Sequence, residues 1–177
     1  MPIADGDPAD DGDIWFRVLT EDDNKYIRKG KIHPNAFKGK NAIVAPDPQK
    51  NRPWDHELSG RLRSLTNDVV AEANAYCEEM TKRTGQTKKF GGVMFCSVQQ
   101  ARQVFEGVIA TRVYYTPLPT TDRAHADLTF NGSVNAAEQV FDKLRLWLCN
   151  VVTGLYPAQI ELLPRAETSP AAYSAPR

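Results

Sequence analysis

The sequence has no long hydrophobic run and no excess of charge of either sign. None of its apolar stretches approaches the ~18 residues that a membrane-spanning helix needs. Lys plus Arg and Asp plus Glu both number 22, so the formal net charge is +0. This balance gives no general electrostatic affinity for nucleic acid or for an anionic membrane surface. The N-terminus is acidic and lacks the basic and apolar regions of a secretory signal. Together these absences predict a soluble, cytoplasmic protein.

Cysteine is scarce, and the common catalytic and metal-binding motifs are missing from the sequence. Cys77, Cys96 and Cys149 are odd in number and stand in apolar surroundings, which predicts reduced core residues rather than disulfides or metal ligands. There is no CxxC, HExxH, GxSxG or P-loop pattern. We therefore expect neither a metal nor a cofactor.

The composition is that of an ordinary globular protein, with 41% hydrophobic and 25% charged residues. A chain of 177 residues is long enough for one domain with a sizeable core. Residues 1–13 carry five aspartates, and residues 165–177 are rich in proline, alanine and serine. Both ends are predicted to be disordered arms flanking a single domain over residues 14–164.

Several segments are typical of strands because they are β-branched, aromatic or continuously apolar. The most prominent pair, 108–115 and 126–130, is joined by a loop that contains Pro117 and Pro119. Further strands are predicted at 14–19 and 93–96.

Helices are predicted where apolar residues recur every three or four positions. A long helix from Leu58 to Lys82 is expected from the stripe Leu58, Leu62, Leu65, Val69, Ala73, Tyr76 and Met80. A shorter helix is expected after Ser97 as far as Gly107, and a third after Ser133 that ends at Gly154. Residues 158–163 are expected to form an edge strand or an extended tail.

The order of these elements predicts an α+β fold. A mixed or mostly antiparallel sheet carries about three helices, one of them long, packed on it. The chain shows no regular βαβ alternation and no glycine-rich turn from strand to helix, which argues against a doubly wound nucleotide-binding fold.

His125 is the sharpest candidate for a catalytic residue. It stands at the entry to a strand after the proline-rich loop, where Arg123 and Asp127 are placed to orient it or share its charge. The alternative is structural: the ring hydrogen-bonds to the backbone and holds the loop in place.

His33 is the second catalytic candidate. It lies in the Lys25–Lys40 segment, the most basic part of the chain, where a phosphate-bearing partner such as nucleic acid is possible although the net charge does not indicate one. Neighbouring cations favour a neutral imidazole, which suits a general base. The alternative is a solvated lysine-rich loop.

Three further residues are candidates for binding. Arg52 and Trp54 together suit an anion or a stacked base, although Trp54 also suits a packing role beside a helix start. Arg17 is the one charge within the first predicted strand, and it suits the binding of an anion.

Four short patterns resemble a group of small uncharacterised bacterial proteins. These are F-R, H-x-x-A-F, P-x-P and A-H-A, at Phe16–Arg17, His33–Phe37, Pro117–Pro119 and Ala124–Ala126. The long helix is a departure from that pattern. The resemblance implies a bacterial source, and we expect such a protein to act beside a larger partner in a defence or toxin-related system.

Two functions follow from these observations. The first is an accessory or binding protein that acts with a macromolecular partner, which we expect to be a protein, and that has no membrane role. The alternative is a small metal-independent enzyme acting on a phosphodiester or similar anion, with His33 and His125 as the acid–base pair and Arg17, Arg52 or Arg123 holding the anion. A shared cleft with the two histidines within about 8 Å favours the enzyme; the sequence leaves the choice open.

Overall fold

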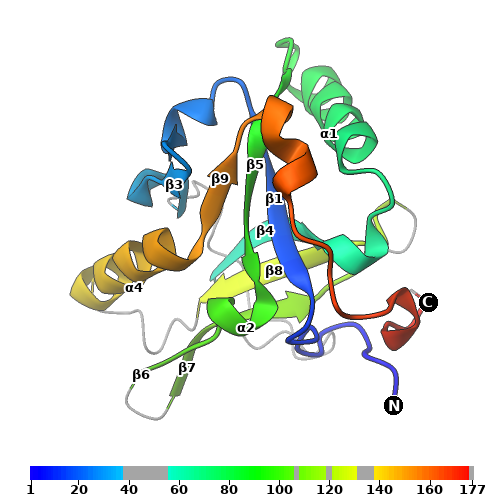
Figure 1. Ribbon diagram of the computed structural model, residues 1–177, viewed down its shortest axis with the longest axis vertical. Helices are drawn as coiled ribbons and strands as arrows, with labels where there is room; N and C mark the ends of the chain where they lie inside the picture. The colour runs from blue at the N-terminus through cyan, green and yellow to red at the C-terminus, as the bar shows by residue number, and fades with distance from the viewer. Residues whose placement is uncertain (38–55, 106–107, 119–120, 131–137, 176–177) are drawn as a thin grey trace.

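The computed structural model describes residues 1–37, 56–105, 108–118, 121–130 and 138–175 (Figure 1). Nine strands form one sheet in the order β2-β3-β9-β5-β1-β4-β8-β7-β6, and their pairings are antiparallel. The strands are β1 Ile14–Thr20, β2 Ile27–Arg28, β3 Lys31–Ile32, β4 His56–Leu62, β5 Phe90–Ser97, β6 Gln103–Phe105, β7 Val108–Tyr115, β8 His125–Phe130 and β9 Thr153–Leu155. The α+β fold class is confirmed.

β1 lies in the middle of the strand order, and its side chains are buried on both faces of the sheet. Trp15 and Leu19 belong to one hydrophobic cluster, whereas Phe16 and Val18 belong to another. A strand buried on both faces is continuously apolar, as this segment is apart from Arg17 and Thr20.

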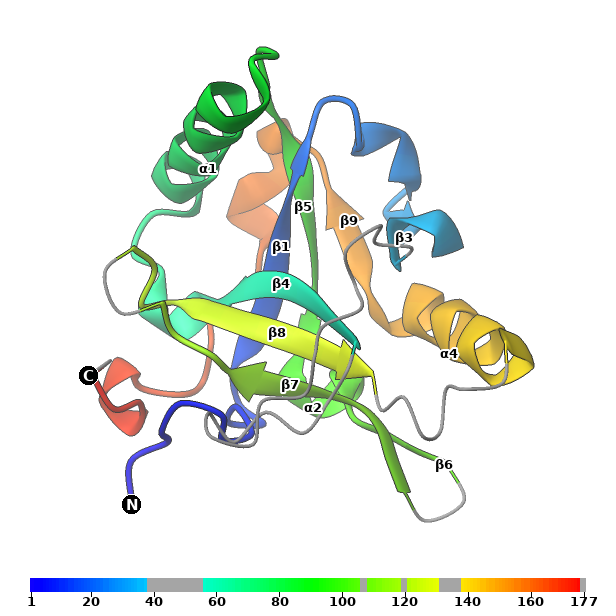
Figure 2. The same cartoon turned by 180° about the vertical axis from the view of Figure 1, so that it is seen from behind.

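Helices cover the two faces separately. Helix α1 (Val69–Thr84) packs Val69, Ala73 and Cys77 into the cluster of Phe16 and Val18. Helix α4 (Glu138–Val151) and the short α2 (Val98–Ala101) contribute Leu148, Val98 and Ala101 to the cluster of Trp15. In Figure 2, β4, β8 and β7 run steeply across β1 and β5, which curves the sheet.

The predicted long helix from Leu58 to Lys82 is wrong in its first half. Residues 56–62 form strand β4, residues 63–65 a 3₁₀ turn, and the helix begins only at Val69. Asp68 caps α1 by accepting from the amides of Val70 and Ala71 at 2.9 and 3.0 Å, and Gly85 ends it in the left-handed conformation. Apolar residues four apart fit a strand as well as a helix, because four is also a multiple of two.

Two other predicted elements differ from the structure. The helix after Ser97 has the predicted cap, with Ser97 and Gln100 forming a capping box, but it ends at Ala101 and the chain continues as β6. Residues 157–162 form a 3₁₀ helix rather than an edge strand. For the third helix, the described part is α4, and its predicted cap Ser133 lies outside the described residues.

The prediction of disordered arms is wrong for residues 1–13 and 165–175. Ile3 and Tyr173 form a parallel bridge, with the Ile3 amide donating to the Ala172 carbonyl at 2.7 Å. Tyr173 is 3% exposed and its hydroxyl donates to Asp13 at 2.9 Å. The two ends of the chain therefore lie side by side (Figure 1) and belong to the domain. Ala9 from the first arm and Tyr173 from the second are buried in the hydrophobic cluster of Trp15.

Candidate functional site

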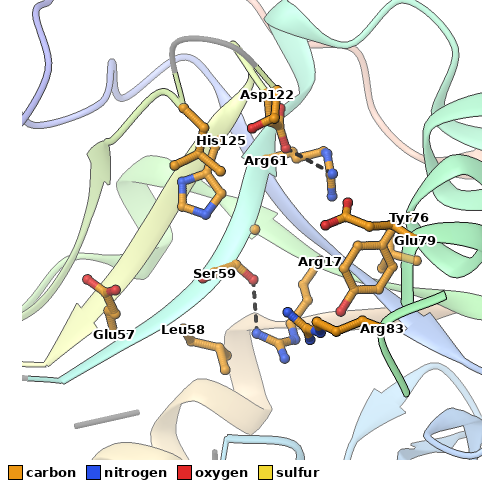
Figure 3. Close-up of a pocket in the computed structure, with 14 residues that line it drawn as sticks. Arg17, Glu57, Leu58, Ser59, Arg61, Tyr76, Glu79, Arg83, Asp122 and His125 are labelled. Carbon is orange, nitrogen blue, oxygen red and sulfur yellow. Dashed lines mark hydrogen bonds and ion pairs between the residues drawn. The ribbon is translucent and has the colours of Figure 1, made fainter. Parts of the chain in front are cut away.

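A pocket of about 420 Å³ opens between β1, β4, α1 and the residues Leu118, Thr121, Asp122 and His125 (Figure 3). Its volume lies within the roughly 300–1,000 Å³ of small-molecule sites. Three arginines and three carboxylates line it together with His125: Arg17, Arg61, Arg83, Glu57, Glu79 and Asp122. The formal charges of these described lining residues cancel, and a fourth carboxylate, Asp127, lies behind His125.

The pocket exists because β1 and β4 separate. They pair only at Trp15–Leu62 and Phe16–Arg61, after which β4 crosses away from β1 (Figure 2). Gly60 permits this crossing, since a Cβ there would lie 2.4 Å from the indole of Trp15. The Trp15 indole donates to the carbonyl of Ala126 at 3.2 Å, which ties β1 to β8 beneath the pocket.

Arg17 occupies the place where the two strands diverge. Its Nη1 donates to the carbonyl of Ser59 at 2.9 Å, and the side chain is half-buried. Burial lowers the pKa of Arg17, while the charges of Tyr76, Asp23 and Asp127 act in the opposite direction. A guanidinium stays protonated under such conditions. Among the described residues no carboxylate forms an ion pair with Arg17, so its charge is available to a ligand.

Arg61, in contrast, is compensated by its neighbours. Its Nη2 lies 2.9 Å from Asp122, its Nε lies 3.7 Å from Glu72, and its guanidinium stacks over Tyr76 at 5.6 Å from the ring centroid. These contacts join β4, α1 and the turn before β8, so Arg61 builds the pocket wall (Figure 3).

The hydrogen bonds of His125 determine which ring nitrogen carries the proton. Its Nδ1 lies 2.8 Å from the carbonyl oxygen of Thr116 and 3.0 Å from the hydroxyl of the same residue. A carbonyl oxygen only accepts, so Nδ1 donates to it. Nε2 is therefore the nitrogen that can gain or lose a proton.

Asp127 lies beside His125 and is fully buried. Its Oδ2 accepts from the Thr116 hydroxyl at 2.7 Å. Its Oδ1 lies 3.7 Å from Nε2 of His125 and has no hydrogen-bond partner among the described residues. The β4–β8 register pairs Arg61 with His125 and Ser59 with Asp127, which places these groups on one face of the sheet.

The structure does not bring the two predicted catalytic histidines together. His33 follows β3, its Nδ1 accepts from the Asn35 amide at 3.2 Å, and it does not line the pocket. Strands β9, β5, β1 and β4 lie between β3 and β8. The condition that favoured a His33–His125 acid–base pair is therefore not met.

The other predicted site residues divide into three groups. Arg17 and Asp127 lie at the pocket or directly behind it. Arg123 is exposed and does not line the pocket. Arg52 and Trp54 lie outside the described residues, so their predicted binding role stays a prediction.

Sequence reasoning missed Arg61, Tyr76 and Arg83. The apolar stripe in the sequence predicts that Tyr76 lies on the buried side of a helix, whereas Tyr76 is only half-buried and lines the pocket. Arg61 would have been found by treating residues 56–62 as a strand, since alternation then places Glu57, Ser59 and Arg61 on one face.

Comparisons of the chain with protein-family models, with curated proteins and with solved structures found no match. Within the described ranges, no helix has the length and apolar character needed to cross a membrane. The same part of the chain holds no group of three or more His, Cys, Asp or Glu side chains suited to a metal ion.

Proposed function

We propose that this protein is a binding protein whose pocket receives an anionic group. The observation that carries the proposal is Arg17, a half-buried guanidinium at a pocket with no carboxylate paired to it among the described residues. Arg83 is exposed, lines the same pocket from α1, and supplies a second cation. Guanidinium groups suit carboxylates and phosphates because their N–H donors form a planar fork.

A second candidate function is chemistry on the bound anion by His125 alone. The Thr116 carbonyl holds the proton on Nδ1 and leaves Nε2 as the acid or base. This version of the enzyme hypothesis uses one histidine in place of the His33–His125 pair. Turnover of an anionic ester that disappears in His125→Asn would support it.

The macromolecular partner is proposed to contact a different part of the surface. Hairpin β2–β3 and the turn before it present exposed cations, Lys25, Arg28, Lys29 and Lys31. They stand at the edge of the sheet, on the far side of β9 and β5 from the pocket. A complex with a macromolecular partner in a bacterial defence or toxin-related system is the setting in which we place this protein.

The test is calorimetric titration of the full chain with sulfate, inorganic phosphate and acetate. We expect Arg17→Met and Arg83→Met each to weaken binding by roughly ten- to a hundredfold, the value of a charge-assisted hydrogen bond. Arg102→Met is the matched control, because Arg102 is exposed and does not line the pocket. Absence of binding by the wild type, or an equal loss in the control, would contradict the proposal. Arg83→Met changes an exposed side chain, so the test does not depend on the folding of Arg17→Met.

A further inference from the structure

Among the described residues that line the pocket, His125 is the one whose side chain is of a type that changes charge near neutral pH. With Nδ1 donating to Thr116, protonation concerns Nε2 alone. The charged and titratable groups that surround it come from every element packed there: Arg17 from β1, Glu57 and Arg61 from β4, Asp127 from β8, Asp122 from the turn before β8, and Tyr76, Glu79 and Arg83 from α1.

Asp127 lies directly beside Nε2. In the neutral imidazole the Nε2 lone pair stands 3.7 Å from a buried carboxylate oxygen that has no hydrogen-bond partner among the described residues. Two electron-rich atoms then face each other, whereas a proton on Nε2 converts the contact into an attraction.

The other charges around the pocket also affect the binding of an anion. Among the described residues, three arginines and three carboxylates line the pocket, and a fourth carboxylate, Asp127, lies behind His125, so a proton on Nε2 offsets the charge of Asp127 and favours an anion. The available donors come from three different elements: Arg17 on β1, Arg83 on α1 and His125 on β8. Donors on different sides suit a tetrahedral group, whose oxygens diverge, better than a planar carboxylate, whose two oxygens one guanidinium can satisfy.

We propose that the pocket binds the phosphate monoester group of a small molecule as its dianion, and that binding is coupled to the protonation of His125 at Nε2. The inference rests on the proposed anion-binding function and names its ligand class and its dependence on pH. Arg17 and Arg83 supply constant charge, His125 supplies the charge that depends on pH, and Asp127 and Thr116 position His125.

The test uses three probes on the full chain. Sulfate stays dianionic between about pH 5.5 and 8.5, a range that spans histidine titration, so its affinity reports protein protonation alone. Methyl phosphate represents the monoester dianion, and dimethyl phosphate the diester monoanion. We expect the affinity for sulfate to fall as the pH rises, by up to about tenfold for each pH unit, because binding is linked to one proton. Titrations in buffers of different ionisation enthalpy should show proton uptake on binding.

His125→Asn and His33→Asn form the matched pair of variants. Asparagine at position 125 retains a donor for the Thr116 carbonyl but carries no charge, so sulfate binding should be weak and independent of pH. His33→Asn should behave as the wild type, because His33 does not line the pocket. Should His125→Asn fail to fold, imidazole NMR of the wild type replaces it. Sulfate should then shift the titration of His125 and leave that of His33 unchanged.

The outcomes separate this inference from the function on which it rests. Sulfate binding that needs Arg17 but does not vary with pH would overturn the proton coupling and leave the anion-binding function intact. Dimethyl phosphate binding as tightly as methyl phosphate would overturn the monoester assignment. No binding of any probe at any pH would overturn both.

Discussion

Thr116 connects the two residues that define the site, His125 and Asp127. Its carbonyl accepts from Nδ1 of His125 at 2.8 Å, and its hydroxyl donates to Asp127 at 2.7 Å. The residue is fully buried at the end of β7. One side chain and its own backbone thus determine both the tautomer of the histidine and the hydrogen bonding of the carboxylate.

Thr116→Val should therefore destabilise the fold. Valine keeps the shape but removes the donor to Asp127, which leaves a buried carboxylate short of a hydrogen bond at a cost of about 1–3 kcal/mol. The free energy of unfolding in urea measures this. Thr121→Val is the control, because Thr121 is exposed. The free energy of unfolding of this variant should stay within about 0.5 kcal/mol of the wild type. Equal losses in the two variants would show that the hydroxyl of Thr116 has no such role.

The cysteines should differ in reactivity according to burial. Burial raises the pKa of Cys96 to about 12, and it also raises the pKa values of Cys77 and Cys149. Cys96 is 1% exposed, whereas Cys149 is half-buried on α4. A maleimide at about pH 8 should label Cys149 first and leave Cys96 unlabelled until the protein unfolds, since the thiolate is the reactive form. Mass mapping of labelled peptides, with denatured protein as the control, tests this; early labelling of Cys96 would contradict its burial.

At the scale of elements, β4 carries the clearest correction to the sequence-based expectation. A helix and a strand both place Leu58 and Leu62 on one face, and only the pairing partners decide between them. β1 and β8 supply those partners, with Trp15 opposite Leu62 and His125 opposite Arg61.

Gly60→Ala distinguishes the two structures by the sign of its effect. In an exposed helix the change would stabilise by about 1 kcal/mol. In β4 the new Cβ would meet the Trp15 indole at 2.4 Å, so we expect a loss of about 1–3 kcal/mol from overpacking. Ser59→Ala, at an exposed neighbouring position, should change stability by less than about 0.5 kcal/mol. Denaturant unfolding of both variants provides the measurement, and a stabilising Gly60→Ala would contradict the strand.

At the scale of the whole molecule, the two chain ends close the fold around a buried carboxylate. Asp13 accepts from the Ile14 amide at 2.7 Å, from the Ser64 hydroxyl at 2.5 Å and from the Tyr173 hydroxyl at 2.9 Å. The ring of Tyr173 also packs on Tyr115, with centroids 4.9 Å apart. Residues from the start, the middle and the end of the chain thus share one network.

Tyr173→Phe should reduce stability and alter its dependence on alkaline pH. The variant loses a hydrogen bond to a charged acceptor, about 1.5–3 kcal/mol at neutral pH. Burial, followed by the negative charge of Asp13, raises the pKa of Tyr173 above its ordinary value of about 10. A raised pKa means that the folded state needs the neutral phenol, so stability is complete below about pH 10 and falls as the pH rises further.

Tyr173→Phe should lose less stability than the wild type as the pH rises from about 9 to 11, the range around ordinary tyrosine titration. Part of the alkaline loss should persist in it, because burial also raises the pKa of Tyr115. Urea unfolding at several pH values is the measurement. Parallel pH profiles for the two proteins would show that Tyr173 ionises as freely in the folded state as in the unfolded chain.

The sequence alone determined the features that depend on local chemistry. The strand at 108–115 is predicted with its correct bounds, since its β-branched and aromatic residues favour extended backbone. The capping residue Ser97 is also predicted correctly, because a cap depends on a few neighbouring residues. These local signals were sufficient for the α+β class.

Tertiary structure alone decided what depends on partners distant in the chain. β4 is a strand because β1 and β8 pair with it, and Tyr173 is ordered because Asp13 and Ile3 bind the tail. The pocket arises where β1 and β4 diverge, and it places Arg17, Arg83 and His125 around one cavity. His33 lies away from this pocket because four strands separate β3 from β8. The order of strands follows from pairings between residues far apart in the sequence, which local patterns do not reveal.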